Sequence, residues 1–227
     1  MAVIDENTVS AKGQLKPTEF VSFEGIEKDG LRIMFVGNSI TRHGVLERIG
    51  WFWDWGMAAS AKEKDYVHQV ISKVRETQPE SVFCICQVAD WERKYVEGNY
   101  DFSVFESARN FNADIIVMRL IENCPKVEDG NFEPFIKAYG ELISYLNPEN
   151  KAKILITTGF WKHTCDDGIR EYARREDLDL VELGDLGELD EMKAIGLFEH
   201  HGVSIHPGDL GMQHIADRIY DGIQKWL

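Results

Sequence analysis

The sequence predicts a three-layer α/β/α domain built around a parallel sheet. From residue 31 onward, apolar runs alternate with helical patterns, which is typical of repeated βαβ units. The apolar runs are nearly continuous rather than alternating, as expected for strands that are covered on both faces. A length of 227 residues is enough for one such domain with a full hydrophobic core.

Each expected element follows from these patterns. Five segments are expected to form the parallel strands: 31–37, 81–88, 113–120, 151–158 and 178–183. Helices are expected at about 62–77, 102–112, 132–147 and 167–177, with a closing helix at 210–226. Right-handed crossovers then place helices on both faces of the sheet. Residues 1–30 are expected to be an N-terminal extension packed on the single domain 31–227, either as an edge strand at 20–26 or wrapped around the core.

Composition excludes several classes of partner. The chain has 39 acidic and 25 basic residues, and its formal net charge of -14 repels nucleic acids and anionic lipid surfaces. Its start lacks the pattern of a secretory signal, and no apolar run is long enough to cross a bilayer, so a cytoplasmic location is expected. The cysteines at positions 84, 86, 124 and 165 have neither CxxC nor zinc-ribbon spacing, which favours reduced, buried thiols.

A hydroxyl group lies in the turn that follows the first expected strand. Gly37, Asn38 and Ser39 come at the carboxyl end of this strand, where open α/β sheets bind their ligands. Backbone N–H groups in such a turn can stabilise a developing oxyanion. The sequence therefore makes Ser39 a candidate nucleophile, although a serine in this place can also simply cap a helix.

A histidine lies in the loop before the closing helix. Pro207 stiffens this loop after His206, and Asp209 can cap the helix. A histidine held in this way can accept the proton that a serine hydroxyl does not release unassisted near neutral pH. His206 is thus the candidate general base, and a surface histidine without a catalytic role is the alternative.

Together the two motifs resemble the SGNH hydrolases, also called GDSL-type lipases and acylhydrolases. The segment from Gly37 to Ile40 is similar to the Gly-Asp-Ser-Leu block of that family, with asparagine in place of aspartate. His206 and Pro207 are similar to its terminal histidine block, and the likeness runs from about residue 31 to the end of the chain. The resemblance implies a flavodoxin-like fold, an acyl-enzyme on Ser39 and no cofactor.

The resemblance also makes Asn123 a donor to the oxyanion, because it falls where the family carries its oxyanion-hole asparagine. Ile121 and Cys124 replace the glycine and aspartate that flank this asparagine in the family. Val203 stands where the family has the aspartate that orients the histidine. We therefore expect a Ser-His dyad, a backbone carbonyl at the histidine, or an acid from elsewhere such as Glu122. No residue after the second strand clearly matches the family's second-block glycine.

Several side chains are expected to bind the substrate. Tryptophans crowd the segment after the nucleophile, and their faces are good platforms for sugar rings or acyl groups, although core packing is an equal alternative. The expected substrate-binding residues are Trp51, Trp53, Trp55, His43, Arg119 and Glu122.

The resulting hypothesis is a serine esterase that cleaves a small ester, with an acetylated carbohydrate as the preferred substrate by analogy with the family. A metal-dependent hydrolase is one alternative, since His200, His201, His206, Asp209 and His214 lie close together in sequence. A catalytically silent carbohydrate-binding domain on the same scaffold is another. The partner is then a small molecule, and a homo-oligomer is left open.

Overall fold

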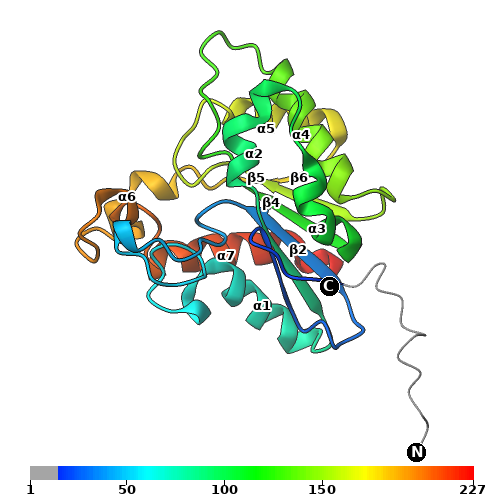
Figure 1. Cartoon of the computed structure of the whole chain (residues 1–227), viewed down its shortest axis with the longest axis horizontal. Coiled ribbons are helices and arrows are strands. Elements are labelled where there is room, and N and C mark those ends of the chain that lie inside the picture. Colours follow the sequence, from blue (N-terminus) through cyan, green and yellow to red (C-terminus); the bar gives the residue numbers. More distant parts are fainter. Residues whose placement is uncertain (1–14) are drawn as a thin grey trace, which may run out of the picture.

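A computed structural model of the chain describes residues 15–227 and shows a six-stranded sheet between two layers of helices (Figure 1). The strands are β1 (Val21–Glu24), β2 (Arg32–Gly37), β3 (Val82–Gln87), β4 (Ile115–Arg119), β5 (Lys153–Thr157) and β6 (Asp179–Val181). Their order in the sheet is β1-β3-β2-β4-β5-β6. The predicted α/β/α fold is confirmed, and the sheet has six strands where five were expected.

The additional strand comes from the N-terminal extension. β1 pairs antiparallel with β3, with Val21 opposite Cys86, so one of the two forms expected for residues 1–30 is present: an edge strand at 21–24. Residues 1–14 of that extension lie outside the described residues. Glu24 at the end of β1 bonds to His68 of the helix α1 (Tyr66–Thr77) at 3.0 Å between Oε1 and Nε2. This contact ties the edge strand to the helical layer.

Helices cover both faces of the sheet. One layer consists of α1 (Tyr66–Thr77) and α7 (Asp209–Ile223), and the other of α2 (Ala89–Lys94), α3 (Glu106–Phe111), α4 (Glu133–Leu146) and α5 (Asp166–Glu176). The alternation of β2 shows the two cores directly, because Ile33 and Phe35 pack against the first layer while Met34 and Val36 face the second. No helix within residues 15–227 has the length and apolar character needed to span a membrane.

The short elements complete the domain. A one-turn helix, α6 (His201–Ser204), lies before α7 at the end of the molecule where the strands terminate in the loops of the site (Figure 1). Single 3-10 turns occur at Glu47–Ile49, Lys62–Lys64, Tyr95–Glu97, Phe102–Phe105, Leu186–Glu188, Asp190–Met192 and Gln224–Trp226. The helices α2 and α6 were not expected from the sequence because neither is long enough to show a helical period.

The strand order determines where a ligand can bind. From β2 the chain moves to β3 on one side and then crosses back to β4 on the other side of β2. The order of the parallel strands therefore reverses at β2, and the loops that leave the carboxyl ends of β2 and β4 diverge from this point. In open α/β sheets such a crevice is the usual ligand site.

Glycine is required at the end of β2. A Cβ at Gly37 would lie 1.9 Å from Oγ1 of Thr41 and 2.4 Å from the backbone oxygen of Arg119. Only glycine allows the turn after β2 to fold this tightly against β4. The turn is then fixed by hydrogen bonds from the Thr41 N–H to the Asn38 oxygen at 2.9 Å and from the Met57 N–H to the Ser39 oxygen at 2.8 Å.

Candidate active site

The fold brings Ser39 and His206 together. The Oγ of Ser39 lies 2.8 Å from Nε2 of His206, although 167 positions separate the two residues in the chain. Ser39 comes from the turn after β2, and His206 from the loop between α6 and α7. A hydroxyl within hydrogen-bond distance of an imidazole nitrogen is the geometry that proton transfer between them requires.

A backbone carbonyl orients the histidine. Nδ1 of His206 lies 2.6 Å from the carbonyl oxygen of Gly202 in α6. Because a carbonyl can only accept, Nδ1 carries the hydrogen and the lone pair of Nε2 faces the Ser39 hydroxyl. The backbone of His206 is held as well, by its N–H to the Val203 oxygen and by the Ala194 N–H to its own oxygen. Of the three orienting groups that the sequence left open, the backbone carbonyl occupies this place.

The surroundings of His206 keep its imidazole neutral. The ring of Trp161 packs edge-on against it, with the ring centroids 5.3 Å apart. Burial lowers the pKa of His206 to about 4, and this effect outweighs the opposite effect of the Gly202 carbonyl. The imidazole is therefore uncharged at neutral pH and able to accept a proton. Trp161 could not be predicted from either motif, since it lies after β5 and far from both in the chain.

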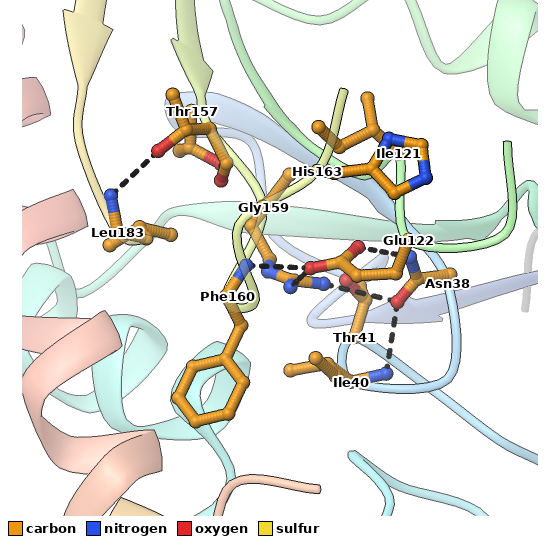
Figure 2. A network of polar contacts seen from close by, with 12 residues as sticks. Asn38, Ile40, Thr41, Ile121, Glu122, Thr157, Gly159, Phe160, His163 and Leu183 are labelled. Atoms are coloured by element: carbon orange, nitrogen blue, oxygen red, sulfur yellow. Dashed lines mark hydrogen bonds and ion pairs between the residues drawn. The ribbon is translucent and has the colours of Figure 1, made fainter. Parts of the chain in front are cut away.

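Asn38, the residue before the nucleophile, is the centre of a buried polar network (Figure 2). Its Nδ2 donates to Oε1 of Glu92 at 2.9 Å and to Oε2 of Glu122 at 2.6 Å. Its Oδ1 accepts from Arg119 at 3.0 Å and from the Ile40 N–H at 3.2 Å. An ionised aspartate has no hydrogen to donate to two carboxylates, so this network explains why asparagine stands where the resembling family has aspartate.

Arg119 and Glu122 both bond to Asn38, in the turn that carries the nucleophile. Their side chains are 0% and 7% exposed and form an ion pair, and Glu122 also accepts from the Phe160 N–H at 2.7 Å (Figure 2). Although burial raises the pKa of Glu122, the Arg119 charge and these hydrogen bonds hold it below its ordinary value. Both residues were expected to bind substrate. Their contacts instead support the turn that carries Ser39.

A further buried carboxylate, Glu92, comes from α2, in the region with no clear match to the second block of the resembling family. Glu92 accepts from Asn38, from the Ile121 N–H and from Nδ2 of Asn123, the last at 2.5 Å. Burial and the nearby Glu122 charge raise its pKa to about 6, against the effect of these three donors. Glu92 thus links the turn after β2 to the loop after β4.

The loop after β4 is strained and held at Asn123. Ile121 has a φ of 115°, a left-handed conformation that β-branched residues rarely adopt. Asn123 is tied at both ends of its side chain, since Nδ2 donates to Glu92 and Oδ1 accepts from Arg93 at 3.3 Å. An amide nitrogen carries two hydrogens, so the second hydrogen of Asn123 is available for a ligand.

The tryptophans after the nucleophile form a packed cluster. Trp51 is fully buried, with ring centroids 5.1 Å from Trp53 and 6.0 Å from Trp55, and its indole N–H donates to the His43 oxygen at 2.9 Å. Burial leaves Trp51 no face for a ligand, while Trp53 is 38% exposed. His43 itself lines a cavity beside the nucleophile turn.

The residues required by the metal-dependent alternative are not assembled. Within residues 15–227, no group of three or more histidine, cysteine, aspartate and glutamate side chains is placed to hold a metal ion. His206 is engaged with Ser39 and Gly202. Asp209 accepts from the Ser60 N–H at 2.8 Å and from Lys64 at the same distance.

The α/β/α fold of this chain is shared by solved esterases. A two-domain esterase active on acetylated mannans, co-crystallised with mannopentaose, superposes with a TM-score of 0.56 at 20% identity over 86% of this chain and 49% of that one. A family two carbohydrate esterase from Clostridium thermocellum, in complex with cellohexaose, has a TM-score of 0.52 at 17% identity over 87% of this chain and 65% of that one.

Acyl transfer also occurs among the similar structures. A salicylyl-acyltransferase from a tetracycline biosynthetic pathway gives a TM-score of 0.54 at 13% identity, over 87% of this chain and 55% of that one. The chain spans about half the length of the mannan esterase. No protein-family profile matches the chain, and neither does any curated protein. At these identities the likeness establishes the fold.

Replacement of Arg119 tests how much its buried charge contributes to the stability of the network around Asn38. Arg119→Met leaves Glu122 buried without its positive partner, and the expected loss in the free energy of unfolding is about 3–5 kcal/mol. Arg218→Met is the matched control, because Arg218 pairs with Asp185 at the surface, where such a pair contributes about 1 kcal/mol or less. Urea unfolding of the three proteins at neutral pH measures both losses. Equal losses would contradict the role assigned to Arg119.

Proposed function

We propose that this protein is a serine esterase that removes a small acyl group from a carbohydrate ester, with acetyl as the preferred acyl group. The reaction passes through an acyl-enzyme on Ser39. The observation that carries the proposal is the 2.8 Å contact between Ser39 Oγ and His206 Nε2, with the histidine held in the required tautomer by Gly202. The shared fold supports it, since two of the similar structures are named as carbohydrate or acetylated-mannan esterases.

In the first step, Ser39 Oγ attacks the ester carbonyl carbon while its proton moves to Nε2 of His206. The carbonyl oxygen becomes an oxyanion, and we assign the Ser39 N–H and the Asn123 amide as its donors. The Ile40 N–H is committed to Asn38 at 3.2 Å, so it does not take this role. Loss of one such donor typically costs on the order of 3 kcal/mol of transition-state stabilisation.

The tetrahedral intermediate then breaks its bond to the alcohol, and His206 delivers the proton to the leaving oxygen. Water, losing a proton to His206, then attacks the carbonyl carbon of the acyl-enzyme. The bond from this carbon to Ser39 Oγ breaks, the acid leaves, and His206 returns the proton to Oγ. The low pKa of His206 favours the donation step, because a weakly basic imidazole gives up its proton readily. No carboxylate is needed at Nδ1 when the Gly202 carbonyl accepts its hydrogen.

The rival functions explain less of this geometry. A domain that only binds carbohydrate does not require a serine hydroxyl at hydrogen-bond distance from a histidine. Nor does it require a carbonyl, here that of Gly202, to set the tautomer of that histidine. A metal-dependent hydrolase needs a ligand set that residues 15–227 do not assemble. The serine mechanism uses the groups that the fold brings together.

Removal of the nucleophile tests the proposal. Ser39→Ala should lower kcat for p-nitrophenyl acetate by at least about a thousandfold, because a side chain that acts in a serine-histidine unit cannot be bypassed. Ser103→Ala replaces an exposed serine in the 3-10 turn Phe102–Phe105 and should retain the wild-type rate. Comparable rates for Ser39→Ala and the wild type would remove Ser39 from the mechanism.

The pH dependence tests the base. As pH falls through the pKa of His206, about 4, Nε2 becomes protonated and can no longer accept the serine proton, so kcat/KM should fall there. Glu92→Gln is the control, since it removes a carboxyl with a pKa of about 6 and leaves the titration of His206 in place. Circular dichroism at each pH verifies that the protein stays folded. An acid limb at 6.5, the ordinary value for histidine, is the contrary result.

A further inference from the structure

A cavity of about 370 Å³ lies beside the nucleophile turn. Its walls come from three parts of the chain that are distant in sequence. Arg42 and His43 follow Ser39, Gln87 ends β3, Asp90 and Arg93 lie on α2, and Phe20 precedes the edge strand β1. The N-terminal extension thus supplies one wall, and the Gln87 N–H donates to the Phe20 oxygen at 2.8 Å to hold it there.

Two residues connect this cavity to the reacting groups. Arg93 donates to Oδ1 of Asn123 at 3.3 Å, and Asn123 is the side chain assigned to the oxyanion. His43, which also lines the cavity, comes four residues after Ser39 in the loop that follows the nucleophile turn. The cavity therefore adjoins the chain just after Ser39 and is linked through Arg93 to the loop that carries Asn123.

The lining offers both donors and acceptors. His43 Nδ1 lies 2.6 Å from the Gly44 oxygen, so Nδ1 carries the hydrogen and Nε2 is left as an acceptor. Gln87 uses its Oε1 on the Ala89 N–H, which leaves its amide hydrogens as donors. Arg93 adds a guanidinium fork and Asp90 adds carboxylate oxygens. Each hydroxyl of a sugar is both a donor and an acceptor, so adjacent hydroxyls match such a mixed lining.

The charges in the cavity are nearly balanced. Arg42 is paired with Asp54 at 2.8 Å, and Asp90 with Lys94 at 2.9 Å. Among residues 15–227, Arg93 forms no ion pair, and Glu19 contributes one carboxylate to the same lining, so the lining holds two basic and two acidic side chains. A ligand that carries its own charge would meet a like charge on one of these walls. The balance therefore favours an uncharged ligand rich in hydroxyls.

We propose that this cavity binds the alcohol half of the ester as an uncharged pyranose, with Arg93 and His43 bonding to ring hydroxyls next to the acylated oxygen. This inference rests on the proposed esterase function and places the sugar along α2 rather than on the tryptophan cluster. Arg93 is then a specificity-determining residue, because its fork distinguishes a hydroxylated alcohol from an apolar one of similar size.

Competition with a simple ester tests the proposal on the full chain. Methyl glycosides of glucose, mannose and xylose should inhibit p-nitrophenyl acetate hydrolysis competitively, while cyclohexanol, a ring of similar size with a single hydroxyl, should not. Arg93→Met should raise the inhibition constant at least about tenfold, as expected when hydrogen bonds from a charged donor are lost. Arg93→Lys, which keeps the charge without the fork, should recover part of the affinity. Arg174→Met, on the exposed side of α5, is the control and should match the wild type.

The outcomes separate the two proposals. If the wild type hydrolyses p-nitrophenyl acetate but none of the three glycosides competes, or if Arg93→Met leaves their inhibition constants unchanged, the sugar site is elsewhere and the inference is overturned. If the wild type does not hydrolyse p-nitrophenyl acetate, the proposed function fails instead. Saturation-transfer NMR of the same glycosides, with wild type and Arg93→Met, then still decides whether the cavity binds a sugar.

Discussion

The contact between Ser39 and His206 depends on two separate restraints, one on the turn that carries the serine and one on the histidine ring. On one side, the buried amide of Asn38 makes four hydrogen bonds, which fix the turn that carries the serine. On the other, the Gly202 carbonyl fixes both the tautomer and the ring plane of the histidine. Neither restraint touches the ester. Both act by pre-organising the groups that do.

This arrangement costs stability. Glu92 and Glu122 are both buried, only Glu122 is paired with Arg119, and Ile121 is held at a positive φ beside them. A protein selected for stability alone would fill this space with apolar side chains. The network instead joins the turn after β2, the helix α2 and the loop after β4, which are the three segments that surround the reacting groups. Strain and buried charge gathered at one place are typical of functional sites.

The periodicity of the sequence was sufficient for the fold, because parallel strands buried on both faces leave continuous apolar runs. The edge strand β1 was one of two arrangements expected for the N-terminal extension, because a strand of four residues leaves little pattern in the sequence. Ser39 and His206 were found from local motifs, whereas Glu92, Trp161 and Gly202 were not. Their roles arise from contacts between distant segments or, for Gly202, from a backbone oxygen that any residue carries. Trp51 was expected at the substrate because sequence shows that an aromatic residue is present but not which way it faces.

The most direct test of the account is to find which residue reacts with a fluorophosphonate, since such a probe forms a bond only with an activated hydroxyl. Mass spectrometry of the digested protein should show the adduct on the peptide that contains Ser39. His206→Ala should abolish labelling while the fold, followed by circular dichroism, is retained. Labelling at another serine, or labelling of Ser39 that persists without His206, would contradict the claim that this pair is the catalytic unit.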